Sequence, residues 1–253
     1  EQTFIYDSYA NRKDKGTHRA LDRAQEYAQH YRYVLQCDVK QFFPSIDHTV
    51  LHNTLARKIA DVALLNLIDR ILESGNGILR DDYEPEWFPG DDLFAVNRPK
   101  GLPIGNLTSQ FWANCYMNPF DNYVKRDVKC PAYLRYVDDF LLFANDKEPL
   151  HQWLAQIKEK LAELRLVLHS GAHPQPVGEG IPFLGFIVFP THRRVKRRKV
   201  VHFQRQLRQA LAEYRHTDLA RSHIHSTIKG WINHVRYADT WGLRKSVLKP
   251  VRL

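Results

Sequence analysis

Apolar residues recur along the first third of this chain at two different spacings, and each spacing predicts a different element. Small apolar residues lie three and four positions apart at Ala20, Leu21, Ala24 and Ala28. This is the spacing of one helix face, so a helix is expected that ends before the next apolar run. That run, residues 33–38, is rich in β-forming side chains and predicts a strand that ends in an aspartate.

Two helices and a loop are expected before position 101. The first helix begins at Asp47 or His48, and the second covers residues 62–72. The sequence Gly-Asn-Gly at 75–77 follows the second helix and is typical of a helix C-terminus. Residues 78–100 are rich in Asp, Pro and Trp without a regular spacing, so they predict an irregular loop.

The remainder of the chain predicts an alternation of helices and strands. We expect a helix over 106–125, a hairpin over 132–144, a helix over 149–164, strands over 180–200 interrupted by Pro190, and helices over 203–214 and 224–237. This order of elements indicates an α+β fold, in which an antiparallel sheet packs against helices on one face.

Composition adds a partner class and a compartment. The 253 residues carry 37 Lys and Arg against 28 Asp and Glu, a net charge of +9 that favours binding of polyanions such as nucleic acid. Three cysteines with no paired spacing, Cys37, Cys115 and Cys130, predict neither disulfides nor a zinc module. We found no apolar run of membrane-spanning length and no signal peptide, so a cytoplasmic protein without a membrane partner is expected.

Two adjacent carboxylates, Asp138 and Asp139, stand between apolar runs in the sequence YLRYVDDFLLF. Taken alone, they fit an ordinary hairpin turn, where aspartate is favoured. Asp38 changes this interpretation, because it ends another apolar strand, and an unpaired carboxylate there is costly unless positive charge meets it. Together the three aspartates predict a site for two Mg²⁺ ions, with Mn²⁺ as an alternative, and a phosphoryl-transfer reaction.

Five motifs in chain order resemble the catalytic core of a reverse transcriptase. They are NRKDKGTH at 11–18, CDVKQFFPSID at 37–47, GLPIGNLTSQ at 101–110, YVDD at 136–139 and IPFLGF at 181–186. The resemblance implies a right-hand polymerase fold with a ferredoxin-like antiparallel palm sheet. Its domains would be partial fingers at 1–32, a palm at 33–200 with a fingers insertion at about 60–100, and a helical thumb at 201–253.

The segment IGNLTSQ at 104–110 resembles one subclass in particular, the reverse transcriptases of diversity-generating retroelements. Membership would imply copying of a template RNA into cDNA with errors at template adenines, from an RNA or DNA primer and dNTPs, together with a small basic accessory protein. Enzymes of the group II intron or antiphage type are the alternative within the family.

The resemblance also assigns roles to single residues. Asp38, Asp138 and Asp139 would be catalytic and hold the metal ions, with the Val39 backbone nearby. The nucleotide-binding residues would be Arg12, Phe43, Ile104, Gly105 and Gln110. Phe43 would exclude a 2′-hydroxyl, or else be an ordinary core aromatic. Ile104 replaces the glutamine of accurate relatives, which predicts weaker discrimination between nucleotides, although Ile104 could also serve packing alone.

Further motif residues would contact the primer and the template. Phe183, Leu184 and Gly185 match the primer grip. A basic and aromatic set is expected to bind nucleic acid along its backbone: Arg193, Arg194, Lys196, Arg197, Arg198, Lys229 and Trp231.

The sequence departs from the family in two places. Residues 169–175, shortly before the primer grip, contain no lysine, so His169 or His173 is a candidate general acid for pyrophosphate release. The chain begins inside the fingers region, so the first fingers strands are expected to be absent from it.

A non-catalytic RNA-binding module and a nucleotide cyclase are the competing interpretations, and the three retained aspartates and the IPFLGF motif weigh against them.

Overall fold

The computed structural model describes residues 2–103, 105–216 and 221–249, in which helices combine with antiparallel sheets. The expected α+β class is therefore confirmed. The chain divides into two compact units, the first made of residues 1–20 and 31–175 and the second of residues 21–30 and 176–253. The assignment of fingers, palm and thumb to parts of these units stays a prediction.

The first unit is built on a sheet of four strands in the order β2-β3-β1-β4. The strands are β1 (Tyr33–Asp38), β2 (Tyr133–Tyr136), β3 (Asp139–Ala144) and β4 (Pro174–Pro176). Strand β3 runs antiparallel to both β1 and β2, and β2 and β3 form the expected hairpin.

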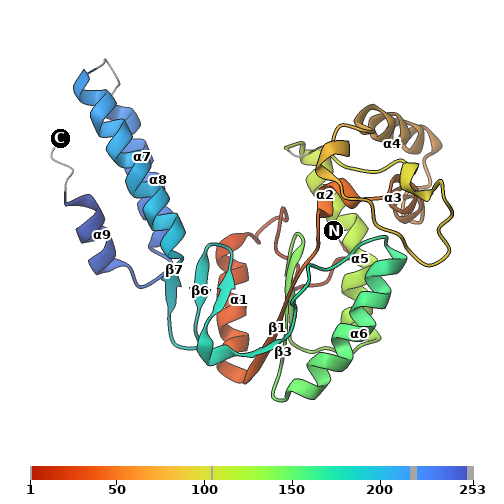
Figure 1. Ribbon diagram of the computed structural model, residues 1–253, viewed down its shortest axis with the longest axis horizontal. Helices are drawn as coiled ribbons and strands as arrows, with labels where there is room; N and C mark the ends of the chain where they lie inside the picture. The colour runs from red at the N-terminus through yellow and green to blue at the C-terminus, as the bar shows by residue number, and fades with distance from the viewer. Residues whose placement is uncertain (1, 104, 217–220, 250–253) are drawn as a thin grey trace. The chain divides into compact units, whose positions relative to one another are not determined.

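The helices of this unit cover the sheet and extend from its end. They are α2 (Phe42–Ser45), α3 (His48–Ala56), α4 (Val62–Gly75), α5 (Leu107–Arg126) and α6 (Lys147–Glu163), with short 3₁₀ turns at Arg80–Asp82 and Ala95–Asn97. Figure 1 shows α5 and α6 on the same side of β1 and β3. Their apolar residues and the inner side chains of β1 and β3 form one buried cluster, as expected for a sheet that packs on helices.

Local capping explains where two helices begin. The Asp47 carboxylate accepts a hydrogen bond of 3.0 Å from the Val50 backbone N–H and caps α3, which confirms the expected start. Asp61 does the same for α4 by accepting from the N–H groups of Ala63 and Leu64. Residues 78–100 are irregular apart from the two 3₁₀ turns, as predicted.

The second unit has a separate small sheet and a set of helices. Three antiparallel strands, β5 (Ile181–Phe183), β6 (Phe186–Val188) and β7 (Arg193–Val195), follow a 3₁₀ turn at Val177–Glu179. The helices are α7 (Arg197–His216), α8 (Arg221–Val235) and α9 (Trp241–Leu248), and most of α1 (Thr17–His30) belongs to this unit. The rings of Phe203 and Trp231 stack with their centroids 4.3 Å apart, and they belong to a small apolar core between α7 and α8.

Some predicted boundaries were wrong. Strand structure ends at Val195, and α7 begins at Arg197 rather than at Phe203. The charged run 196–199 concealed this start, because it supplies no apolar residue until Val200, which then joins Phe203 and Leu207 at helical spacing. Helices α2 and α9 were not predicted. Among the described residues, no helix has the length and apolar character needed to cross a bilayer.

Candidate active site

The strand register brings two of the predicted carboxylates to one edge of the first sheet. Asp38 is the last residue of β1 and lies directly opposite Asp139, the first residue of β3. Because side chains of directly opposed residues share a face, these two carboxylates lie on the same side of the sheet. The Val39 backbone N–H donates a hydrogen bond of 3.3 Å to the carbonyl of Asp138, which brings that turn beside the end of β1.

The hairpin turn that carries Asp138 has an unusual backbone. Tyr136 pairs with Asp139, so Val137 and Asp138 alone connect the two strands. Val137 has a φ of +59°, in the left-handed region that β-branched residues rarely enter. The turn therefore holds a strained residue immediately before Asp138.

The sequence predicted a costly buried carboxylate at Asp38, but the more buried carboxylate is that of Asp138. Asp38 is exposed, because β1 ends at the surface, whereas Asp138 is partly buried. Burial, together with the negative charge of Asp38, raises the pKa of the Asp138 carboxyl above its ordinary value. A cation bound near both groups would oppose this shift, because it favours the charged carboxylate.

Neighbouring polar groups orient the site. The Gln36 amide donates to the Asp139 carboxylate at 3.2 Å, and the backbone N–H of His169 donates to the Asp38 carbonyl at 2.9 Å. Lys40 forms ion pairs with Glu84 at 2.7 Å and with Glu86 at 2.9 Å, which tie the irregular loop to the segment after Asp38. His169 thus has its backbone beside Asp38, while the ring of His173 contacts the carbonyl of Gly171.

Among the described residues, no group of three or more His, Cys, Asp or Glu side chains is gathered closely enough to form a ready metal site. The donor set nevertheless fits a hard divalent cation, since carboxylate oxygens are the ligands that Mg²⁺ prefers. Burial is the main cause of the raised pKa of Asp138, and the negative charge of Asp38 adds to it, while backbone hydrogen bonds and the positive charge of Arg135 oppose it.

The predicted nucleotide-binding residues occupy different settings. Phe43 is partly buried against the core of the first unit, with its ring 5.4 Å from that of Phe42. Gly105 has a φ of +104°, which favours glycine, and Gln110 is partly buried in the first turn of α5. Ile104 lies outside the described residues. The Arg12 guanidinium donates to the carbonyls of Ile5 and Ser8, which favours a structural role for it.

The primer-grip motif forms the turn between β5 and β6. Phe183 is fully buried and pairs with Phe186, and Leu184 and Gly185 connect the two strands with φ values of +47° and +90°. Two successive residues with positive φ are typical of a tight hairpin, and glycine at the second place makes it less strained. The Gly185 carbonyl accepts a hydrogen bond of 3.0 Å from the Lys196 N–H.

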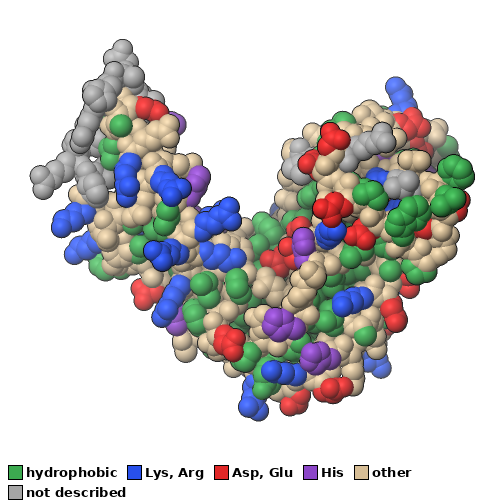
Figure 2. Space-filling model, in the orientation of Figure 1, with side chains coloured by type: hydrophobic (Ala, Val, Ile, Leu, Met, Phe, Trp, Pro, Cys, Tyr) green, Lys and Arg blue, Asp and Glu red, His purple; other side chains and the backbone are tan. Residues whose placement is uncertain are grey.

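Most of the basic residues predicted to bind nucleic acid lie on the surface of the second unit. Figure 2 shows Lys and Arg side chains gathered over this unit, where Arg194, Arg197, Arg198 and Lys229 are exposed and Lys196 is partly so. Arg193 differs, since its side chain is 11% exposed and pairs with Asp22 at 2.6 Å.

The structure argues against the expected contact of Trp231 with nucleic acid. Its ring is buried against Phe203 in the core between α7 and α8, where a bound strand would not reach it. A tryptophan at helical spacing within an apolar face is more often a core residue, and here that is its place.

Sequence reasoning missed two polar residues that support the carboxylates. Gln36 stands two positions before Asp38 on the same face of β1, so the period of a strand could have revealed it. Arg135 is 1% exposed and pairs with the equally buried Asp121 at 2.7 Å. The available signal was the position of Arg135 itself, a charged residue directly before YVDD in an otherwise apolar run. Its burial could be explained only once its partner Asp121 was known.

Asp38 and Asp139 thus oppose each other where two antiparallel strands end, and Asp138 lies in the adjoining turn. Residues 2–188 match the family described as reverse transcriptase (RNA-dependent DNA polymerase), and the chain belongs to this family. The domain is thus that of an RNA-directed DNA polymerase.

Two curated relatives are distantly similar to the chain. The COX1/OXI3 intron 2 protein of Saccharomyces cerevisiae is 23% identical over 123 residues, which cover 49% of this chain and 13% of that protein. Protein YkfC of Escherichia coli K12 is 22% identical over 205 residues, covering 66% of this chain and 48% of that protein. The chain therefore spans less than half the length of either relative.

Proposed function

We propose that this chain copies an RNA template into cDNA, with Asp38, Asp138 and Asp139 as its catalytic carboxylates. The observation that carries the proposal is the register of β1 against β3, which sets Asp38 opposite Asp139 beside the turn that holds Asp138. Membership of the reverse transcriptase family supports the same chemistry.

The three carboxylates would hold two Mg²⁺ ions. When bound, such ions activate the primer 3′-hydroxyl and neutralise charge on the triphosphate. Asp38, at the exposed end of β1, would be accessible to the incoming nucleotide. Asp138 and Asp139 are positioned by the hairpin of β2 and β3. The side chain of His169, whose backbone is bonded to Asp38, is exposed and is the better placed of the two candidate general acids.

Phe43 would select dNTPs over rNTPs. Its partly buried ring is fixed by the edge of Phe42, and its carbonyl is bonded to the Leu102 N–H at 3.0 Å. Phe43→Val is therefore expected to raise the efficiency of rNTP incorporation relative to dNTP by about 10-fold or more, since the packed ring no longer excludes the 2′-hydroxyl. Single-nucleotide extension with each substrate measures this ratio, and an unchanged ratio would leave Phe43 a core residue.

We further propose that the polymerase belongs to a diversity-generating retroelement, is error-prone at template adenines, and works with a small basic accessory protein. The sequence IGNLTSQ supports this subclass, with Ile104 in place of an amide side chain. Sequencing of cDNA made on a defined RNA, with wild type and with Ile104→Gln, tests the proposal. Errors concentrated at adenines, reduced by Ile104→Gln, would support it. Accurate cDNA from the wild type would retain the polymerase and reject the subclass.

A further inference from the structure

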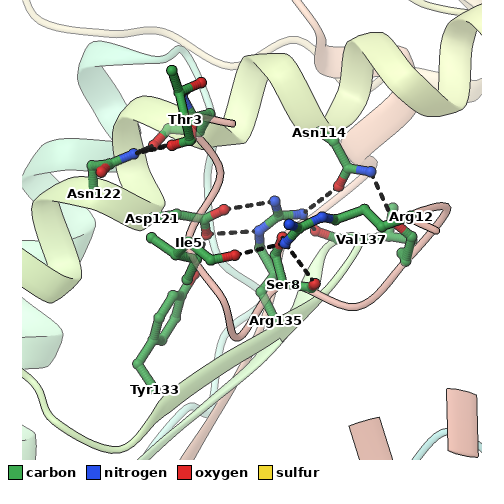
Figure 3. Close-up of polar contacts among 12 residues, drawn as sticks. Thr3, Ile5, Ser8, Arg12, Asn114, Asp121, Asn122, Tyr133, Arg135 and Val137 are labelled. Atoms are coloured by element: carbon green, nitrogen blue, oxygen red, sulfur yellow. Dashed lines mark hydrogen bonds and ion pairs between the residues drawn. The ribbon is translucent and has the colours of Figure 1, made fainter. Parts of the chain in front are cut away.

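Arg135, which lies in β2 two residues before Val137, is as deeply buried as any charged residue that the structure describes in the first unit. Its side chain is 1% exposed, and Figure 3 shows its guanidinium at the centre of a polar network. An arginine is almost never buried to this extent unless its charge is paired and its donors are satisfied. Each of its contacts therefore bears on what it does.

One side of the guanidinium is held by a carboxylate. Nε and Nη2 of Arg135 donate to the two oxygens of Asp121 at 2.8 and 2.7 Å, and the Tyr133 hydroxyl donates to the same carboxylate at 2.6 Å. Asp121 lies on α5 and is also 1% exposed. This two-pronged pairing fixes the plane of the guanidinium, as a single ammonium could not.

The remaining nitrogen reaches the catalytic turn. Nη1 of Arg135 donates to the Val137 carbonyl at 2.7 Å and to the Asn114 side chain at 3.3 Å. Asn114 in turn donates to the Ala10 carbonyl at 2.8 Å, next to the NRKDKGTH motif. The Arg135 backbone is paired with the same N-terminal segment, since its N–H donates to the Asp7 carbonyl. The network thus joins α5, the N-terminal segment and the turn (Figure 3).

The turn needs such support. Val137 is the one residue of the two-residue connection with a positive φ, and this kind of turn normally has glycine at its first place. A valine there is strained, and strained conformations persist only where surrounding contacts over-determine them. The bond from Arg135 to the Val137 carbonyl is such a contact, and Asp138 directly follows.

We propose that Arg135 is a positioning residue for polymerisation: clamped by Asp121, it holds the Val137 carbonyl and thereby fixes the turn that places Asp138 beside Asp38. The inference rests on the proposed function, because Asp138 is taken as a catalytic carboxylate. It assigns Arg135 an effect on the chemical step through the turn, without contact with substrate.

The sharpest variant is Arg135→Lys, which keeps the buried charge but cannot pair with both Asp121 oxygens and also reach Val137. We expect kcat in primer extension to fall about 10- to 100-fold, the range typical when an orienting partner of a ligand residue is removed. The KM for dNTP should change less than about 3-fold, since every substrate contact is kept. Retention of wild-type kcat would overturn the proposal.

Two further variants separate positioning from stability. Arg135→Gln combined with Asp121→Asn removes both buried charges together, so neither is left unpaired, and we expect a folded protein with the same kcat defect. Arg98→Lys is the matched control, because Arg98 pairs with Asp47 at 3.2 Å and has a side chain 11% exposed. Its thermal midpoint should fall while kcat stays within about 3-fold. Equal kcat losses in Arg98→Lys and Arg135→Lys would contradict a specific role.

A double-mutant cycle tests whether Arg135 acts through the Val137 backbone. Glycine adopts the left-handed conformation without strain, so the turn should need Arg135 less in the Val137→Gly background. The kcat loss caused by Arg135→Lys is expected to be at least about 3-fold smaller there than in the wild-type background. The same loss in both backgrounds would show that Arg135 does not work through this turn.

A readout that does not depend on activity distinguishes this inference from the proposed function. Hydrogen exchange at residues 136–140 and at the Val39 N–H, which bonds to Asp138, should accelerate in Arg135→Lys but not in Arg98→Lys. If wild type made no cDNA yet this difference appeared, the proposed function would fail and the positioning role would stand. Active wild type with unchanged exchange in Arg135→Lys would reject the positioning role alone.

Discussion

The turn that carries Asp138 and the helical surface of the second unit use charge in opposite ways. At the turn, Arg135 and Asp121 are fully buried, and each nitrogen of the guanidinium has a defined partner. On the second unit, basic residues such as Arg197 and Arg198 are exposed and surround a small apolar core. The buried pair acts through hydrogen bonds of fixed direction, whereas the exposed basic residues contribute positive charge spread over a surface.

This difference predicts how each region responds to change. A buried network fails when one partner is removed, because the remaining group is left without water or a counter-charge. A charged surface loses affinity for nucleic acid gradually as basic residues are removed, and salt screens the attraction of the basic residues that remain. The proposed function would need both behaviours, since chemistry requires fixed geometry whereas the template must slide.

The largest stability loss is expected from Asp121→Ala, which leaves the Arg135 guanidinium buried and unpaired. Breaking such a pair costs about 3–5 kcal/mol, so the midpoint of urea unfolding should fall sharply. The combined Arg135→Gln and Asp121→Asn variant should be much less destabilised. A loss below about 1 kcal/mol for Asp121→Ala would mean that the network is not a strong support.

The core of the second unit should respond next. Trp231→Ala removes the ring that stacks on Phe203 and should destabilise the α7–α8 pair by about 3 kcal/mol. Trp241→Ala is the matched control, because that ring is 67% exposed and its removal should change stability by about 0.5 kcal/mol at most. Hydrogen exchange of α7 and α8 measures both, and equal effects would contradict the assignment of Trp231 to the core.

A smaller and salt-dependent effect is expected on the basic surface. Arg197→Ala with Arg198→Ala should weaken binding to an RNA–DNA hybrid several-fold and reduce the slope of log affinity against log salt by about 1 for each phosphate that is no longer bound. Lys158→Ala with Lys160→Ala removes the same charge from α6 and should leave that slope unchanged. Fluorescence anisotropy over a range of salt concentrations distinguishes the two pairs.

The smallest effect concerns Asp91 in the irregular loop. Its hydrogen bonds with Arg165 and with the Phe88 N–H hold the pKa of the Asp91 carboxyl below its ordinary value. A lowered pKa in the folded state contributes stability above the unfolded pKa, near pH 4, and this contribution is lost as pH falls through the folded value. Asp91→Asn should therefore lower the thermal midpoint at pH 7, with a difference that shrinks below about pH 4. A constant difference would exclude this linkage.

The same contrast explains what the sequence could and could not predict. Local patterns were enough for the hairpin and the Asp47 helix start, because strand period and capping act within a few residues. The catalytic role of the three aspartates stays a prediction. The start of α7 was misplaced, since a run of charges carries no apolar period.

Long-range partners were beyond local patterns. The Arg135 pair with Asp121 spans 14 positions and two different elements, and nothing in either segment alone indicates that both charges are buried. The place of Trp231 was hidden for a related reason, because a tryptophan beside basic residues fits both a nucleic-acid surface and a core. Only its stacking partner, Phe203, decides between them.

Primer extension on a defined RNA template, with dNTPs and Mg²⁺ and with Asp138→Asn beside Asp146→Asn, tests the central claim most directly. Asp146 is an exposed aspartate whose side chain makes no capping bond to α6, so it receives the same substitution without a catalytic role. We predict cDNA from wild type and Asp146→Asn, and a loss of about 1,000-fold or more in Asp138→Asn. Equal extension by all three proteins, or none by the wild type with either Mg²⁺ or Mn²⁺, would contradict the claim.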